Sequence, residues 1–259
     1  MSESPLRRLL QRQKPGSGDF SRHIELYVPG NNLTLLARGG DVYRAMWKAI
    51  EDAEETIHLE TYILRSDRTG HEFAKRLEAK ARCGVRVRVI FDSIGSLDID
   101  PSFVHRMRNA GVQFLEYHPL APWRPRWSWW FRDNRKALIV DGKIAFTGGT
   151  NICDDHAPIK DGGNDWYDIH VGLEGPAAHE LDRLFRALWF KETGRWFPID
   201  LRARPPAGRS KVWVVANQEF IYRYRIRAAY LNALKAAKSQ VVIANAYFVP
   251  SRKLSDALR

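Results

Sequence analysis

The chain has 259 residues, of which 44% are hydrophobic and 12% aromatic, a composition that excludes an intrinsically disordered protein and predicts one or two globular domains. Lys and Arg number 41 against 30 Asp and Glu, and the net charge of +11 favours a polyanionic partner, either nucleic acid or an acidic membrane surface. The sequence has only two cysteines, Cys83 and Cys153, and they lack metal-ligand spacing. A disulfide framework is therefore not expected, which favours a reducing compartment.

Membrane-spanning and secretory segments are not expected. No apolar run in the sequence approaches the roughly 20 residues that a transmembrane helix takes, and the basic N-terminus has no signal-peptide core. The sequence therefore predicts a cytoplasmic protein that is at most peripheral to a membrane.

Strands and helices are expected to alternate along the chain. Strands are predicted, in order, at residues 56–64, 85–92, 112–117, 166–174, 211–217 and 240–249. Helices are predicted at residues 41–53 (with Asp41 as N-cap), 72–82, 101–110, 176–192 and 221–238. This alternation predicts an α/β protein built as a layered sandwich, a mixed sheet flanked by helices.

Composition divides the chain into four segments. Residues 1–20 are basic and contain Gly, Ser and Pro, which predicts a flexible N-terminus. Residues 21–195 are expected to form a first lobe, and the Pro-containing segment 196–210 a linker. Residues 211–259 are expected to begin a second lobe.

The second lobe is inferred from an internal repeat. Residues 233–241 lie over residues 49–57, and residues 246–248 lie over residues 61–63, with one residue inserted between the two blocks. A repeat of this period is typical of a protein made of two similar halves. The second copy is therefore expected to be truncated.

The pattern N-x-K-x4-D-x6-G-G-x-N, which begins at Asn134, is the most informative stretch of the sequence. Asn134 and Lys136 are two apart on an expected strand, so they share one face. Asp141 and Gly142 lie between two apolar runs, which predicts a β-hairpin with these residues in the turn.

The second half of the pattern suits a phosphate group. The returning run of the hairpin ends at Gly148 and Gly149, where bare backbone can approach a ligand closely. Lys136 and Asn151 supply a cation and an amide for phosphate oxygens. An ordinary amphipathic hairpin is the alternative interpretation.

This pattern resembles the H-x-K-x4-D-x6-G-[SG]-x-N signature of the phospholipase D superfamily, with Asn134 where the family has its His. The resemblance covers nearly all of residues 33–259 and is strongest to the bacterial cardiolipin synthase branch. Other residues that carry it are Glu60-Thr61-Tyr62-Ile63, Asp67, Gly70, the run from Gly84 to Val89, the run from Asp92 to Ser96, Trp166, Asp168, His170, Glu174-Gly175-Pro176 and the run from Ala246 to Ser251.

The resemblance implies a mechanism and a substrate class. In that superfamily two motifs, one per lobe, meet; one His attacks phosphorus to form a phosphohistidine, and the other acts as general acid and then base. No metal and no cofactor take part. Cardiolipin synthases pass a phosphatidyl group to a second phosphatidylglycerol, so anionic phospholipid, a membrane surface and a location peripheral to the inner membrane are expected. Nucleic acid is the less favoured partner.

The resemblance also assigns roles to individual positions. Asn134, Lys136 and Asp141 occupy the catalytic motif positions, and Lys136, Gly148, Gly149 and Asn151 are expected to bind phosphate, with Asp141 supporting the motif by hydrogen bonding. An amide nitrogen has no usable lone pair, so Asn134 cannot be the nucleophile. Because a second motif is also absent from the sequence, little or no phosphatidyl transfer is expected from this chain.

Several other polar residues are candidates for lining the site. Glu60 and Asp92, at strand ends, and His118, in a loop, could do so, although capping and surface roles suit the two acids equally well. None of the eight histidines precedes a Lys by two residues. His156 is a weaker candidate in a loop near the motif, and His170 is expected to be structural.

A segment rich in Trp and Arg, residues 123–132, directly precedes the motif. Its amphipathic rings and cations would suit a lipid headgroup interface, and they would equally suit stacking on single-stranded nucleic acid. Packing of the tryptophans beneath a Pro-containing loop is the structural alternative.

Three functions thus remain open at the level of sequence. The leading hypothesis is a cardiolipin synthase-like phosphatidyltransferase that is inactive or impaired in this chain. The alternatives are a non-catalytic protein that binds anionic lipid or phosphate, and a phospholipase D-type nuclease. The resemblance around Trp166 and from residue 246 to 251 favours lipid over nucleic acid.

Overall fold

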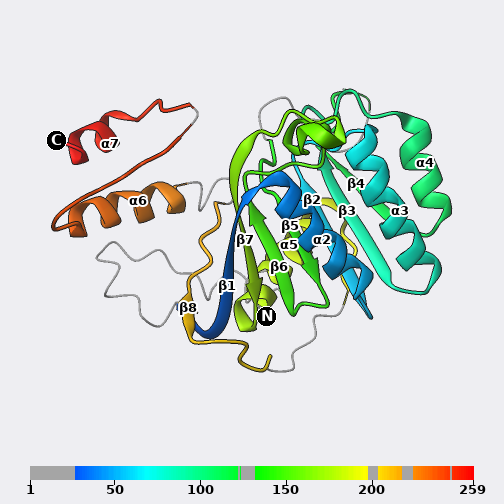
Figure 1. Ribbon diagram of the computed structural model, residues 1–259, viewed down its shortest axis with the longest axis horizontal. Coiled ribbons are helices and arrows are strands. Elements are labelled where there is room, and N and C mark those ends of the chain that lie inside the picture. Colours follow the sequence, from blue (N-terminus) through cyan, green and yellow to red (C-terminus); the bar gives the residue numbers. More distant parts are fainter. Residues whose placement is uncertain (1–26, 122, 124–131, 198–203, 218–223, 246) are drawn as a thin grey trace. The chain divides into compact units, whose positions relative to one another are not determined.

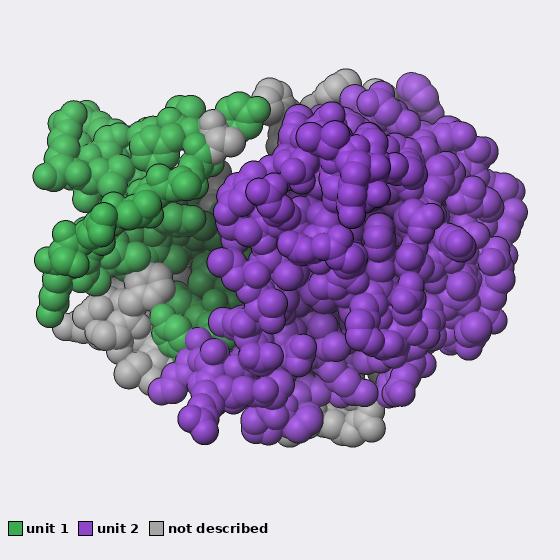
Figure 2. All heavy atoms as spheres, viewed as in Figure 1, with its two compact units in different colours: residues 1–28, 212–259 green, residues 29–211 purple. Residues whose placement is uncertain are grey.

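The computed structural model describes residues 27–121, 123, 132–197, 204–217, 224–245 and 247–259. The predicted flexible N-terminus and most of the Trp- and Arg-rich segment lie outside these ranges. The chain divides into two compact units, residues 29–211 and residues 1–28 with 212–259 (Figure 2). The lobe and linker boundaries expected from the sequence stay predictions.

The larger unit is built on a mixed sheet (Figure 1). Its strands are β1 (Val28–Arg38), β2 (Thr56–Thr61), β3 (Arg86–Asp92), β4 (Gln113–Tyr117), β5 (Ala137–Val140), β6 (Ile144–Gly148), β7 (Tyr167–Glu174) and β8 (Ser210–Val212). They lie in the order β4-β3-β2-β5-β6-β7-β1-β8. Strands β2, β3 and β4 are parallel, whereas β2-β5, β5-β6, β6-β7 and β7-β1 pair antiparallel.

Helices cover both faces of this sheet. The helices are α2 (Gly39–Glu51), α3 (Arg68–Arg82), α4 (Pro101–Asn109), α5 (Pro176–Thr193), α6 (Arg225–Ala236) and α7 (Arg252–Ala257), with short 3-10 helices η2 (Asp154–His156) and η3 (Ile159–Asp161). Helices α6 and α7 belong to the smaller unit. None of the helices in the described part of the chain is long and apolar enough to cross a membrane.

The main core lies between one face of the sheet and helices α2, α3 and α4. Ile57 and Leu59 of β2 and Leu138 of β5 are buried in it. His58 points to the opposite face, where its ring stacks on Phe185 of α5 with the centroids 4.5 Å apart. Because both faces are covered, every residue of β2 is buried, as in the parallel sheets of α/β proteins. The predicted α/β layered fold is confirmed.

Most predicted elements form within a few residues of their expected bounds. The motif hairpin is confirmed: Asp141 and Gly142 both adopt positive φ, 52° and 58°, and the N–H of Lys143 donates to the carbonyl of Val140 at 2.9 Å. Such angles are those of a type I′ turn. Helix α5 ends, as expected, at Gly194 in the left-handed conformation.

The start of α2 differs from the prediction. The helix begins at Gly39 with Arg38 as its N-cap, so Asp41 is not the cap but lies in the first turn, where it pairs with Arg44. Glycine is required at this helix start, because a side chain at Gly39 would meet the backbone oxygen of His156 at 1.9 Å.

Three strands differ from the sequence analysis. Strand β1 was not predicted, and in the structure it pairs with β7. The strand expected at residues 211–217 is reduced to β8. The one expected at 240–249 does not form in its described part, where Val242 is exposed. High strand propensity is insufficient there because no described strand pairs with this segment.

Candidate functional site

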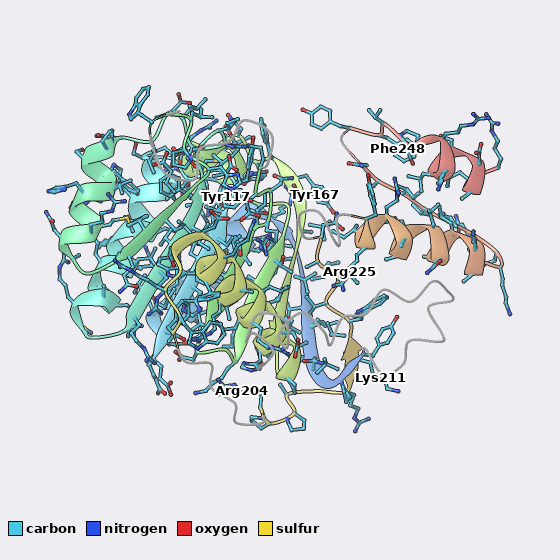
Figure 3. All side chains as sticks on the ribbon, turned by 180° about the vertical axis from the view of Figure 1, so that it is seen from behind. Tyr117, Tyr167, Arg204, Lys211, Arg225 and Phe248 are labelled. Carbon is cyan, nitrogen blue, oxygen red and sulfur yellow. The ribbon has the colours of Figure 1, made fainter. Side chains whose placement is uncertain are left out.

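Three positions, two of them in the motif, lie in one row across the sheet. Ala137 of β5 pairs with Thr147 of β6, and Gly148 pairs with His170 of β7. Lys136 therefore lies beside Gly148, and the Thr147 hydroxyl donates to the Lys136 carbonyl at 2.9 Å. The row Lys136–Gly148–His170 lies at the end of the sheet where β7 begins at Tyr167 and β4 ends at Tyr117 (Figure 3).

Lys136 is a buried cation held by Asn134. Its Nζ donates to the backbone oxygen and to the Oδ1 of Asn134, both at 3.0 Å. The ammonium lies 5.6 Å from the centroid of the Tyr62 ring. Burial lowers the pKa of Lys136, while the nearby carboxylates of Asp168 and Asp133 act in the opposite direction. Two neutral oxygens thus orient the charge.

Asn151 is fixed beside the same segment of chain. Its Oδ1 accepts from the Ile63 N–H at 3.2 Å, and its backbone oxygen accepts from the Tyr43 hydroxyl at 2.8 Å. Because the amide oxygen is engaged, the Nδ2 group is the end of the side chain that can donate to a ligand. Asn134, Lys136 and Asn151 are called the Lys136 site below.

The two glycines have a packing role that the sequence did not reveal. A side chain on Gly148 would meet the backbone oxygen of Ile169 at 2.3 Å, and one on Gly149 would meet the carboxylate of Asp168 at 2.1 Å. Their bare backbone therefore accommodates β7. The expectation that it faces a ligand stays a prediction.

Two histidines and one carboxylate lie near Lys136, and of these the sequence had indicated only His156, as a weak candidate. Burial lowers the pKa of His170 to about 4, with Asp168 opposing this shift and His156 and Lys136 adding to it. Burial also lowers the pKa of His156, against the charges of Asp168 and Asp155. The Trp-x-Asp-x-His alternation around β7 was the available signal, because it places Asp168 and His170 on one face.

Asp141 lies at the other end of β5, away from the Lys136 site. Its carboxylate accepts from the backbone N–H groups of Glu54, Glu55 and Thr56 at 3.0, 2.8 and 2.7 Å. The side chain thus ties the hairpin turn to the start of β2. The structure does not bring Asp141 together with Lys136 and Asn151.

Glu60 lies on the opposite face of the sheet from Lys136. Glu60 pairs in register with Ala137, the neighbour of Lys136, so its side chain lies on the same face as that of Arg135. The Nε of Arg135 lies 2.9 Å from Glu60 Oε1 and 3.0 Å from Asp133 Oδ1. Burial and the Asp133 carboxylate raise the pKa of Glu60, although Arg135 opposes this. These groups form a buried ionic cluster behind the motif.

Asp92 and His118 anchor the chain that leads into the motif. The buried Asp92 carboxylate accepts from the Asp133 N–H at 2.9 Å and from the Ile94 N–H at 2.9 Å. His118 lies near Glu192, with Nε2 3.7 Å from the carboxylate, and its backbone oxygen accepts from the Ser93 hydroxyl. Both contacts position loops around the site.

The arrangement suits an oxyanion. A buried ammonium, an amide donor and an imidazole N–H are the groups that bind phosphate oxygens. Among the described residues, no group of three or more His, Cys, Asp or Glu side chains could hold a metal ion.

Comparison with known proteins identifies the family. The family model described as "Cardiolipin synthase, PLD-like domain" matches residues 46–189, over half of the chain. The chain belongs to this family, as the resemblance of its motif predicted.

Individual relatives agree with this assignment. The chain is 35% identical over 240 residues to cardiolipin synthase B of Shigella flexneri, covering 89% of this chain and 57% of that protein. It is 30% identical over 230 residues to the cardiolipin synthase of Geobacillus kaustophilus, covering 87% and 46%. The chain therefore spans about half the length of these relatives. The crystal structure of Nuc from Salmonella typhimurium, a phospholipase D family member, is 17% identical with a TM-score of 0.46, covering 62% of this chain and 95% of Nuc.

Proposed function

We propose that the Lys136 site binds the phosphodiester of an anionic phospholipid of the phosphatidylglycerol class, as one half of a cardiolipin synthase-type phosphatidyltransferase. The family and the names of the relatives support this ligand class. The net charge of +11 supports work at an acidic membrane surface, to which the protein would bind peripherally from the cytoplasm.

The observation that carries the proposal is the state of Lys136. Its Nζ is hydrogen-bonded to two neutral oxygens of Asn134, and it forms no salt bridge with a carboxylate of the described residues. Only 9% of the residue is exposed. A buried cation without an ion pair is costly unless an anion compensates it. A phosphodiester oxygen would supply that charge.

Binding and catalysis are carried by different atoms in this site. The side chain of Asn134 presents a carbonyl oxygen to Lys136, and its nitrogen has no lone pair with which to attack phosphorus. His170 does not replace it, because Thr150 N–H donates to its Nδ1 at 3.4 Å and so engages the lone pair of the neutral ring. We therefore propose that this polypeptide binds the headgroup with little or no phosphatidyl transfer.

Binding is tested by titration with sulfate and by co-sedimentation with vesicles of phosphatidylglycerol or phosphatidylcholine. Lys136→Met should abolish sulfate binding and reduce sedimentation with phosphatidylglycerol. Lys143→Met is the matched control, because Lys143 carries the same charge in the same hairpin and is exposed. Equal sulfate affinity of wild type and Lys136→Met would refute the site.

Turnover is tested separately. Purified wild-type protein should convert little or no phosphatidylglycerol to cardiolipin, since an imidazole is absent at position 134. Asn134→His, assayed in the longest natural form of the protein, should gain turnover if this position limits the reaction. Robust turnover by the wild-type chain would show that another residue is the nucleophile.

A further inference from the structure

Three buried polar atoms next to the Lys136 site have no hydrogen-bond partner among the described residues. They are Nε2 of His170, Nδ1 of His156 and Oγ1 of Thr150. Their residues are 1%, 5% and 3% exposed, respectively. Buried polar groups in proteins are almost always paired, so an unpaired group marks a place where a ligand or water binds. Three of them together indicate a ligand.

The hydrogen bond from Thr150 fixes the tautomer of His170. The Thr150 N–H donates to Nδ1 at 3.4 Å, so Nδ1 carries the lone pair. In the neutral ring the proton then resides on Nε2, because one nitrogen donates and the other accepts. His170 thus presents a buried N–H donor without an acceptor.

His156 differs in that its free nitrogen can take up a proton. The Trp166 backbone favours the charged form of the His156 ring, and Nδ1 of His156 has no hydrogen-bond partner among the described residues. Protonation at Nδ1 therefore breaks no hydrogen bond, whereas protonation of His170 at Nδ1 would break the bond from Thr150. Of the two, His156 is the ring that can gain a charge at lower cost.

The charges around the two rings explain why His156 needs a bound anion to take up a proton. Lys136 disfavours protonation of both rings, and the single nearby carboxylate shared by both is that of Asp168. Asp155, beside His156, is already paired with Arg65 at 2.7 Å. On α2, which packs against His156 at Gly39, Asp41 is paired with Arg44.

The sheet places the rings close to Lys136. Gly148 separates Lys136 from His170 in the row across β5, β6 and β7, and it has no side chain to screen one from the other. A Cβ on Gly148 would lie 2.8 Å from Nδ1 of His170. An oxyanion bound to Lys136 is thus within the field of both imidazoles.

We propose that His156 and His170 form, beside Lys136, a second oxyanion subsite in which the binding of a phosphate group is coupled to the uptake of one proton. The subsite rests on the proposed function. His170 donates its Nε2–H to an oxygen of the anion. A proton from solvent adds to Nδ1 of His156, and the anion compensates the new charge.

The experiment is calorimetric titration with sodium sulfate at constant ionic strength, between pH 5.5 and 8. Sulfate does not titrate in this range, so any pH dependence belongs to the protein. Titrations in buffers of different ionisation enthalpy count the protons taken up. We expect uptake of up to one proton and an affinity that rises as pH falls, by at most about tenfold per pH unit for one linked proton.

Variants assign the effect to each ring. His156→Gln should remove the proton uptake and flatten the pH dependence, and His170→Phe should weaken binding at every pH. His179→Gln is the control, because His179 is a partly buried histidine on α5 whose pKa burial also lowers. It should leave affinity and proton uptake unchanged.

The outcomes separate the two proposals. Sulfate binding that depends on Lys136 but takes up no proton at any pH overturns the coupled subsite and leaves the proposed function standing. The same holds if His156→Gln binds sulfate with the pH dependence of the wild type. Absence of sulfate binding by the wild type throughout the range overturns both.

Discussion

Replacing Asp141 by Asn should destabilise the protein while leaving the Lys136 site intact. The carboxylate accepts three backbone N–H groups, those of Glu54, Glu55 and Thr56, at 3.0, 2.8 and 2.7 Å. The Asn oxygen can take the place of Oδ1, which accepts two of the three. Its amide group would then face the N–H of Glu54, donor against donor.

The magnitude follows from these contacts. Hydrogen bonds to charged groups contribute roughly 1.5–3 kcal/mol, and an unsatisfied buried donor costs roughly 1–3 kcal/mol. Loss of one bond and of the charge on the others gives about 2–3 kcal/mol for Asp141→Asn. Backbone strain adds little, because Asn tolerates the left-handed conformation that Asp141 adopts at φ 52°. Urea denaturation measures the change in the free energy of unfolding.

Asp165→Asn is the matched control for this substitution. Asp165 has almost the same backbone conformation, φ 50°, but its carboxylate pairs at 3.0 Å with the exposed side chain of Arg38. Exposed ion pairs contribute at most about 1 kcal/mol. If Asp141→Asn changes stability no more than Asp165→Asn, the anchoring role is refuted. If it instead abolishes sulfate binding in a stable protein, Asp141 belongs to the binding site.

Three further predictions use the same assays. Gly148→Ala should destabilise by about 1–3 kcal/mol, because its Cβ would meet the backbone of β7 at 2.3 Å. Gly149→Ala should mainly weaken sulfate binding, because its Cβ would lie 2.1 Å from the carboxylate of Asp168 and that movable carboxylate would have to shift. A loss of stability greater than that of Gly148→Ala would contradict this prediction. Burial lowers the pKa of His170 to about 4, below the 6.5 of an unfolded chain. Between those pH values only the unfolded state binds the proton, so the free energy of unfolding decreases by up to about 3 kcal/mol as the pH is lowered from 6.5 to 4. His170→Gln should make the free energy of unfolding depend less steeply on pH.

Local signals in the sequence were sufficient for the hairpin and for several helix ends. Asp141 and Gly142 adopt the positive φ angles that an Asp-Gly turn requires. Pro176 and Gly194 bound α5 for equally local reasons, namely a fixed φ at the helix start and a left-handed residue at its end. Asn134 and Lys136 were expected to share one face because they are two residues apart, and the Oδ1 of Asn134 lies 3.0 Å from the Nζ of Lys136.

What the sequence could not supply was the register between distant strands. The position of Glu60 opposite Ala137 puts its side chain on the face away from Lys136, and a shift of one residue would have reversed this. The pairing of Gly148 with His170 brings that ring to the site for the same reason. Strand β1 depends on β7 in the same way. Pairings of this kind are decided by tertiary packing rather than by residues close in sequence.

If the proposed function holds, the geometry of Lys136 lets the site bind its ligand without a nucleophile at position 134. Binding depends on where the cation and the donors lie, and these places are set by β5, β6 and the Asn134 oxygens that hold the ammonium. Covalent chemistry depends on one lone pair at one position. Asn at 134 has no such lone pair but provides an oxygen that holds Lys136, so in the proposed function headgroup binding and covalent catalysis depend on separable features. A histidine introduced at 134 would remove the amide oxygen that now accepts from the Lys136 ammonium, so Lys136 would keep only the backbone oxygen of residue 134 as a partner there.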